Sequence, residues 1–168
     1  MRRLAAAAAV ATLFCEFGQL QAASENRIDL AAIITKKEAE LALGEAVNDP
    51  QPRNGEGADG YYSRCNYYSQ NPGRSLILRV RQASPEQLAP AKQLEELIAG
   101  SAAIKPVSGL GDKAAVASES AEKGFSRALM LYVAKGHAFV TVGIGGTSDE
   151  KVALEKAKGL ARKILAKL

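Results

Sequence analysis

The sequence predicts an α+β fold in which an antiparallel sheet of about five strands carries three helices, mainly on one face. Stretches of alternating apolar residues separated by short turns indicate hairpins. Stretches with apolar residues at helical spacing start at capping residues and, in two cases, end at glycine. The expected order is α-β-β-α-β-β-β-α, and the hairpin connections make the sheet antiparallel.

The first helix is expected at 35–43, because Thr35 and Glu38 form a capping box and Gly44 provides a stop. Residues 48–60 are rich in Pro, Gly and Asn, which predicts a loop. A hairpin follows, with aromatic-rich 61–69 and apolar 75–83 as its strands.

A second helix is expected from Ser84 and Pro85 to Gly100, with the proline at its first position. A short edge strand at 103–107 and a weak strand at 114–117 flank a tight turn. The turn is formed by Gly109, Leu110, Gly111 and Asp112.

The last hairpin is expected at 125–133 and 137–144, with both of its faces at least partly covered. One face carries Leu129, Leu131, Val133, Val140, Val142 and Ile144, and the other carries Met130, Tyr132 and Phe139. The residues from Thr147 to Glu150 are typical of a capping box and predict the start of a final amphipathic helix.

Residues 1–23 are typical of a secretory signal peptide: Arg2 and Arg3 precede an apolar run, and small residues end at Ala23. The apolar run is too short for a spanning helix, which needs about 20 residues. A lipidated Cys15 is the other alternative, against which the bulky Phe14 argues. We therefore expect a single α+β domain at 24–168 that is periplasmic or secreted.

The composition limits the classes of function. Of 168 residues, 47% are hydrophobic and 24% charged, which is ordinary for a globular protein. The formal net charge of +4 is spread along the chain without a basic stripe, so nucleic acid is not an expected partner. One His and two Cys exclude a His-rich metal centre or a Cys₄ zinc site, and no cofactor is expected.

Two residues could support nucleophilic chemistry. Cys65 could act as a thiol paired with His137, the only imidazole. The alternative for Cys65 is a small buried thiol in mid-strand, and the alternative for His137 is a residue next to a turn. The sequence favours these structural roles and a non-enzymatic protein.

A row of Tyr and Arg on one face of the first hairpin is the candidate partner-binding site. A two- or four-residue turn would pair Arg64 with Arg81, Asn66 with Arg79, and Tyr68 with Ile77, without an acid among them. Such a row suits an unknown protein or an anionic ligand, unless Glu side chains from the helices neutralise it. The candidate residues are Tyr62, Arg64, Asn66, Tyr68, Arg79 and Arg81.

The final helix is basic, with lysines such as Lys151 and Lys158 facing outward. A basic amphipathic helix can lie on an anionic membrane, but a solvated face over the core is the favoured interpretation.

Several short motifs resemble those of small exported domains of unknown function that are common among actinobacterial lipoproteins. They are the helix from Thr35 to Gly44, the strand with Cys65-Asn66-Tyr67, the turn from Val107 to Asp112, and Lys135-Gly136 before a Phe-Val-Thr-Val strand. The resemblance covers most of 34–168 and implies an exported α+β domain without assigned catalytic residues. This chain departs from the pattern because it has no convincing lipobox.

Together these observations predict an exported, non-enzymatic binding domain of the bacterial envelope. Two other classes stay open: an inhibitor or immunity protein of a periplasmic enzyme, and a thiol-dependent hydrolase that uses Cys65 or His137.

Overall fold

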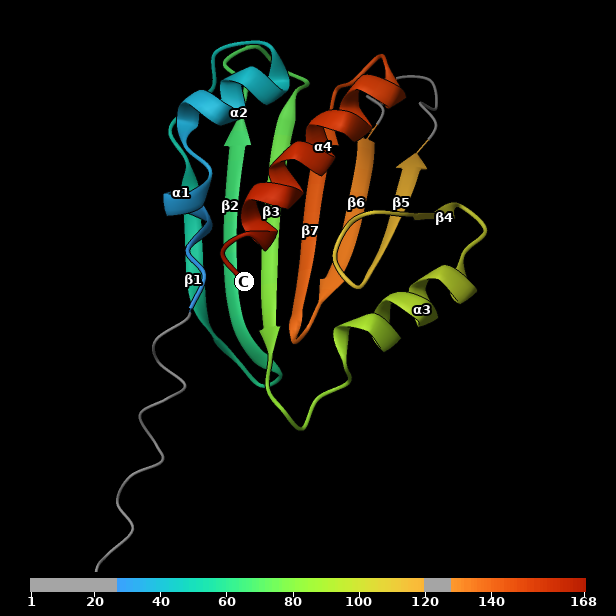
Figure 1. Ribbon diagram of the computed structural model, residues 1–168. Helices are drawn as coiled ribbons and strands as arrows, with labels where there is room; N and C mark the ends of the chain where they lie inside the picture. The colour runs from blue at the N-terminus through green and yellow to red at the C-terminus, as the bar shows by residue number, and fades with distance from the viewer. Residues whose placement is uncertain (1–26, 120–127) are drawn as a thin grey trace, which may run out of the picture.

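A single antiparallel sheet with helices on both faces forms the structure (Figure 1), a computed structural model that describes residues 27–119 and 128–168. In chain order the elements are α1 (Leu30–Ile33), α2 (Lys36–Leu43), β1 (Gln51–Gly57), β2 (Gly60–Tyr68), β3 (Ser75–Ala83), α3 (Pro90–Gly100), β4 (Ile104–Val107), β5 (Lys113–Glu119), β6 (Ala128–Lys135), β7 (Ala138–Gly145) and α4 (Glu150–Leu165). The strand order is β1-β2-β3-β7-β6-β5-β4. The predicted class is confirmed, but the described residues form seven strands and four helices, not about five and three.

The larger core lies between the sheet and three helices, α1, α2 and α4, which stand in front of the sheet in Figure 1. Period-two alternation in the strands directs every second side chain into this core. The predicted apolar face of the last hairpin is confirmed, with Leu131 opposite Val142 and Val133 opposite Val140. The largest fully buried side chains include Leu30, Ile34, Tyr67, Leu76, Leu78, Leu129, Leu131 and Ile164.

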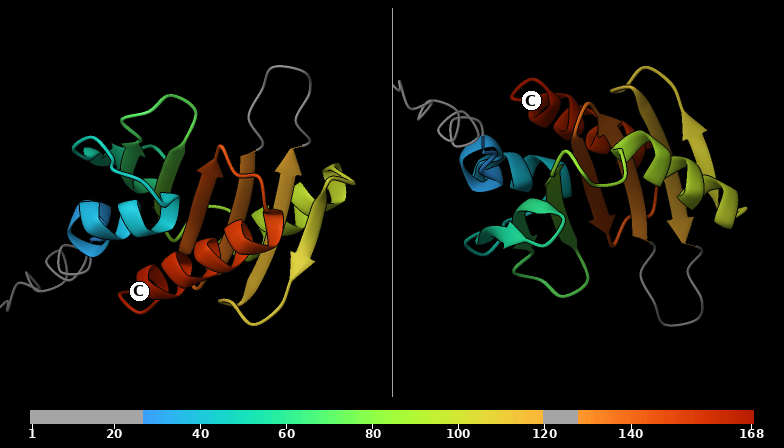
Figure 2. Two further views of the ribbon diagram at one scale, coloured as in Figure 1. Left: turned by 90° about the horizontal axis from the view of Figure 1, so that it is seen from above. Right: turned by 90° about the horizontal axis from the view of Figure 1, so that it is seen from below.

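Helix α3 packs on the opposite face, where Leu94 meets Ala115, Ala134 and Phe139 in a smaller apolar cluster. Tyr132 joins this cluster, with its ring centroid 6.2 Å from that of Phe139. The predicted partial cover of this second face is therefore confirmed. The end-on views in Figure 2 show α3 alongside the β4–β6 end of the sheet, away from β1. No described helix packs on this face over β1 and β2.

The prediction of a loop at 48–60 is wrong, because Gln51–Gly57 forms the edge strand β1 and pairs along its whole length with β2. Ala58 and Asp59 form the connecting turn. Every residue of β1 is exposed, so the segment has no apolar alternation by which a sequence could reveal it. Pro52 is tolerated because an edge strand has one side without ladder hydrogen bonds.

The helix ends follow capping chemistry, although two starts were misplaced. The capping box of Thr35 and Glu38 is confirmed, and Gly44 ends α2 with φ of 77°. Helix α3 begins at Pro90 rather than at Pro85, because the second proline occupies its first turn. In α4 the N-cap is Asp149, not Thr147, and its carboxylate accepts from the Val152 amide at 3.1 Å.

The short edge strand is confirmed as β4, whereas β5 is longer than the expected 114–117. The first residues of the strand expected from 125 lie outside the described residues. So does the expected leader at 1–23, including Cys15. In the part of the chain that the structure describes, no helix has both the length and the apolarity needed to cross a bilayer.

Candidate binding surface

Three arginines lie side by side on the sheet face that α3 leaves open. Arg53 of β1 is directly opposite Arg64 of β2, and Arg64 is directly opposite Arg79 of β3. Residues that pair in this way point to the same face, and neighbouring strands are about 4.8 Å apart. We call Arg53, Arg64 and Arg79 the arginine ladder. All three are exposed, and the row continues into the buried Thr141 of β7.

The ladder carries three positive charges that no carboxylate among the described residues neutralises. Arg64 has an aromatic contact only: its guanidinium carbon lies 5.2 Å from the centroid of the Tyr62 ring. Like charges directly opposite each other destabilise a sheet by roughly 0.2–1 kcal/mol per pair. The ladder is therefore an arrangement that folding alone does not favour.

The ladder differs from the predicted row because the register is shifted by two residues. Six residues separate β2 from β3, so Arg64 faces Arg79 rather than Arg81, and Asn66 faces Ile77 rather than Arg79. A shift of two preserves the face of every side chain, so the predicted residues do share one surface. Sequence reasoning missed Arg53, because it lies in the segment expected to be a loop.

Arg81 and Tyr62 form one flank of the ladder and are held by Asp59, an acid that the sequence prediction left out. Tyr62 donates to the Asp59 carboxylate at 2.7 Å, and Arg81 Nη1 donates to it at 2.9 Å. Arg81 Nη2 also donates to Gln93 of α3 at 2.6 Å, and its side chain is only 12% exposed. The prediction of a face without an acid is thus wrong at Arg81, which anchors α3 to the sheet.

The same contacts set the protonation of this flank. The hydrogen bond from Tyr62, followed by the contact with Arg81, lowers the pKa of the Asp59 carboxyl. Burial and the Asp59 carboxylate raise the pKa of Tyr62, so its hydroxyl keeps its proton at neutral pH. Asp59 therefore remains negative and neutralises Arg81, which leaves the charge of the ladder itself unchanged.

Asn66 and Tyr68 form the other flank. Asn66 Nδ2 donates to the Tyr68 hydroxyl at 3.1 Å, and Tyr68 is 39% exposed. Half-buried Ile77 lies opposite Asn66. The surface as a whole combines fixed positive charge with aromatic and apolar side chains.

The predicted turn at Gly109, Leu110, Gly111 and Asp112 has a structural role. Both glycines adopt positive φ, 77° and 55°, and Leu110 is buried in the larger core. Asp112 accepts from the Gly136 amide at 2.6 Å and so fixes the β6–β7 turn. These residues stand away from the ladder, which lies across β1, β2 and β3.

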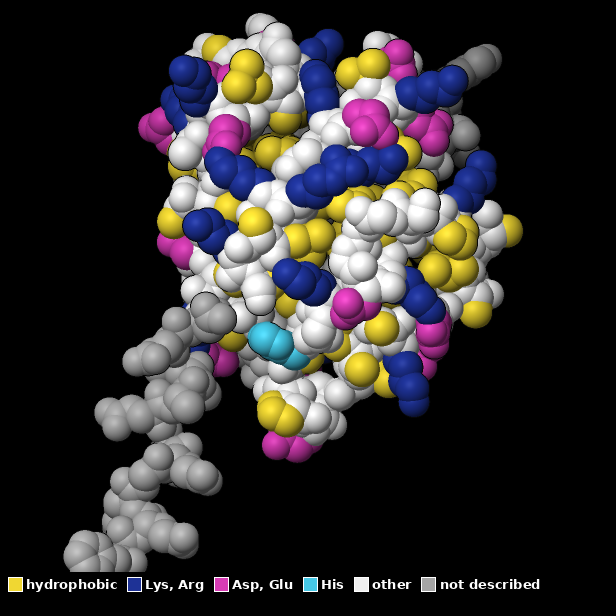
Figure 3. All heavy atoms as spheres, in the orientation of Figure 1, with side chains coloured by type: hydrophobic (Ala, Val, Ile, Leu, Met, Phe, Trp, Pro, Cys, Tyr) yellow, Lys and Arg dark blue, Asp and Glu magenta, His cyan; other side chains and the backbone are white. Residues whose placement is uncertain are grey.

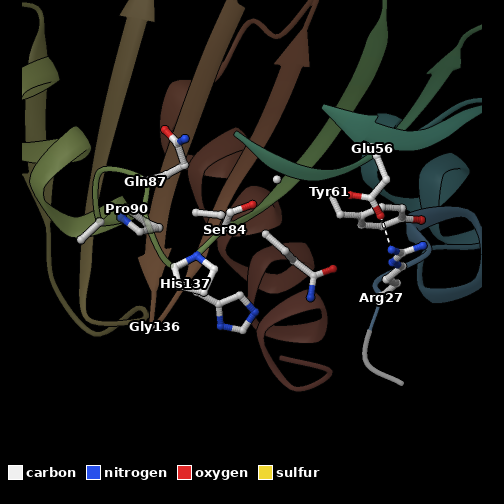
Figure 4. Close-up of a pocket in the computed structure, with 13 residues that line it drawn as sticks. Arg27, Glu56, Tyr61, Ser84, Gln87, Pro90, Gly136 and His137 are labelled. Atoms are coloured by element: carbon white, nitrogen blue, oxygen red, sulfur yellow. Dashed lines mark ion pairs between the residues drawn. The ribbon is translucent and has the colours of Figure 1, made fainter. Parts of the chain in front are cut away.

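A cleft of about 690 Å³ lies at one end of the sheet, between residue 27, the loop before α3 and the β6–β7 turn (Figure 4). Tyr61, Ser84, Pro90 and His137 line it. Its formally charged side chains, Arg27 and Glu56, form an ion pair, and Arg27 also lies 5.2 Å from the Tyr61 ring centroid. The cleft therefore presents no net charge to a ligand, in contrast to the ladder.

Cys65 and His137 do not meet. Cys65 is fully buried in the larger core and lies level with Leu78 and Val142, whereas His137 is exposed and five residues from Val142. That offset is roughly 16 Å along the strand. Burial raises the pKa of the Cys65 thiol, which disfavours the thiolate needed for nucleophilic attack.

The basic side chains of α4 lie on the helix-covered face, where Figure 3 shows dark-blue side chains along the helix. Two of its lysines are paired: Lys163 with Glu38 of α2, and Lys158 with Glu155 at 2.8 Å. Part of the charge of α4 thus serves contacts within the protein.

Within residues 27–119 and 128–168, no three His, Cys, Asp or Glu side chains gather as metal ligands. No protein-family model matches the sequence, and a search of curated proteins finds no significant relative. The resemblance to small exported domains therefore stays a prediction.

Proposed function

We propose that this chain is an exported, non-enzymatic binding domain of the bacterial envelope, and that its binding surface is the open face centred on the arginine ladder. The observation that carries the proposal is the ladder itself: three adjacent arginines without a neutralising acid among the described residues. A negatively charged partner would turn this unfavourable arrangement into three charge-assisted contacts. Arg is suited to this because its planar guanidinium binds carboxylate or phosphate through two hydrogen bonds.

Two further observations support the non-enzymatic part of the proposal. The thiol of Cys65 is buried, and its distance from His137 gives the pair no common reaction centre. The cleft that contains His137 holds an internally neutralised ion pair. The leader-like residues 1–23 support export to the periplasm or beyond.

A second candidate is an inhibitor or immunity protein that caps a periplasmic enzyme. The composition of the surface favours it, because Tyr and Arg are enriched among the residues that dominate protein interfaces. The two candidates share one surface and differ in the partner, an enzyme in the second case.

The experiment is a comparison of captured partners. The exported protein, its Arg64→Thr variant and its Arg162→Gln variant are immobilised and exposed to an envelope extract. Arg162 is exposed on α4, on the opposite side of the sheet, so it controls for loss of one charge. We expect a partner that is retained by wild type and Arg162→Gln and lost with Arg64→Thr. Equal capture by all three proteins would contradict the proposal.

A further inference from the structure

We infer that the partner of the ladder is an acidic α-helix that lies across the strands, with carboxylates at i, i+4 and i+7 facing Arg53, Arg64 and Arg79. The inference rests on the proposed function and specifies the chemistry and shape of its partner. Four features of the open face support it: spacing, available space, flanking side chains and the choice of Arg over Lys.

The spacing of the ladder matches a helix. From Arg53 to Arg79 there are two strand intervals, which is about 10 Å. Residues i and i+7 of a helix lie about 10.5 Å apart along its axis, and side chains at i and i+4 are about 5–6 Å apart. In an extended strand, three residues on one side span about 13 Å. Three carboxylates on such a strand would therefore be spaced more widely than the three arginines, which span about 10 Å.

The open face also has room for a helix. α3 already packs on this face over the β4–β6 end, so the sheet accepts a helix there in the protein itself. The exposed part of the row, from β1 to β3, spans about 10 Å, which is about two helical turns. A bound helix would lie beside α3 and complete the second layer.

The flanks of the ladder suit the sides of such a helix. Gly55 lies opposite Tyr62, and no atom lies within 4 Å of the position that a Cβ would take there. The surface is therefore open at its β1 end. Tyr62 and Ile77 lie on either side of the row and offer apolar contact to residues next to the carboxylates. A helix with an acidic stripe bordered by apolar residues fits this arrangement.

The residue types on this open face, Arg and Tyr without Lys, favour a protein partner over a lipid or a polyphosphate. Every basic residue in β1, β2 and β3 is Arg, while α4 carries mostly Lys. Protein interfaces are enriched in Arg and Tyr and depleted of Lys. The ladder and its tyrosines have that composition.

The test uses two synthetic peptides of equal composition and about 15 residues, built from Ala and Gln. In the first, Glu stands at i, i+4 and i+7; in the second, at i, i+2 and i+4, the spacing of a strand. Long-chain polyphosphate is a third probe. Affinity is measured by fluorescence anisotropy with the exported protein and with Arg64→Thr, Arg53→Thr and Arg162→Gln, each checked for folding by thermal melting.

We expect the first peptide to bind at least about tenfold more tightly than the second and to gain helical circular dichroism on binding. Loss of Arg64 or Arg53 should weaken that binding about tenfold or more, since a hydrogen bond to a charged group is lost. Arg162→Gln should bind as wild type does.

Equal or tighter binding of the second peptide, tighter binding of polyphosphate, or no binding of either peptide would overturn the helical partner. The proposed function has a separate readout, because it fails only when envelope partners are captured equally without Arg64. If an envelope partner is lost with Arg64→Thr but the helical peptide does not bind as expected, the arginine ladder remains the proposed binding surface and the helical partner is rejected.

Discussion

Cys65 shows how burial governs the chemistry of a single residue. Its side chain is fully buried in the larger core, and burial raises the pKa of its thiol. We expect the native processed protein to resist an alkylating thiol reagent near pH 8, because both the thiolate fraction and access are low. The denatured chain, labelled under the same conditions, is the control. Rapid labelling of the native protein would contradict this and restore the thiol-dependent hydrolase as a candidate.

The contribution of Asp59 to the stability of the fold depends on pH. The hydrogen bond from Tyr62 and the contact with Arg81 lower its pKa in the folded state, so its carboxylate stabilises the fold. That contribution is present above the unfolded pKa of about 3.9 and is lost as pH falls through the lower folded value. Asp59→Asn should therefore unfold at lower urea than wild type at pH 7.

The difference between wild type and Asp59→Asn should shrink as pH falls below about 4, because the wild-type carboxyl then becomes protonated as well. Glu86→Gln is the control: Glu86 is exposed before α3 and pairs with no described residue. A stability difference that stays constant from neutral to acid pH would show that Asp59 acts through its shape and not its charge.

At the scale of elements, the turn before β5 depends on a glycine. A Cβ on Gly111 would lie 2.4 Å from the Ala134 carbonyl oxygen, and its φ is +55°. We expect Gly111→Ala to lower the free energy of unfolding by about 3 kcal/mol, from backbone strain and this clash. Gly136→Ala is a matched control, because φ is +54° and the Cβ position is open.

Gly136→Ala should cost only the strain of positive φ, about 1–2 kcal/mol, as measured by urea denaturation. Equal losses in the two variants would mean that the chain near Gly111 relaxes away from Ala134.

The ladder predicts an unusual substitution effect in β2. Arg64 has an arginine opposite it on both sides, so Arg64→Thr removes two repulsions and adds a residue with high strand propensity. The isolated variant should be as stable as wild type, or more stable by up to about 1 kcal/mol, in chemical denaturation. A less stable variant would identify Arg64 as a structural residue and weaken the binding proposal.

The sequence predicted those elements whose signals are local. Thr35 and Glu38 fixed the start of α2, and the alternation from Leu129 to Val133 fixed the inward face of β6. It could not reveal β1, because a fully exposed edge strand such as Gln51–Gly57 has neither apolar periodicity nor strand-forming side chains. Ser84 and Pro85 predicted the start of the second helix, whereas α3 begins at Pro90, which is buried.

The candidate site was predicted only in part for the same reason. The shared face of Tyr62, Arg64 and Arg79 followed from strand parity, which a register shift of two does not alter. Arg53 lies in β1 and Asp59 lies in the turn after it, and both fall within the segment 48–60 that was expected to be a loop.

At the scale of the whole molecule, the export proposal makes a prediction about processing. Small residues at Ala22 and Ala23 favour cleavage there, so mass spectrometry of the exported protein should give an N-terminus at Ala23 or Ser24 without lipid. A chain that begins at a diacylated Cys15 would contradict this and place the protein on a membrane surface.

The strand order has a consequence for when the protein can fold. β7 is the last strand to be synthesised, yet it pairs with both β3 and β6 at the centre of the sheet. Before residues 138–145 are available, the chain can form only two separate three-stranded pieces, each with an unpaired edge. The full sheet can therefore form only after nearly all of the chain has been made. Pairing between strands so distant in the sequence is also slow. If the chain crosses a membrane unfolded, the complete sheet would therefore form only after β7 has reached the far side.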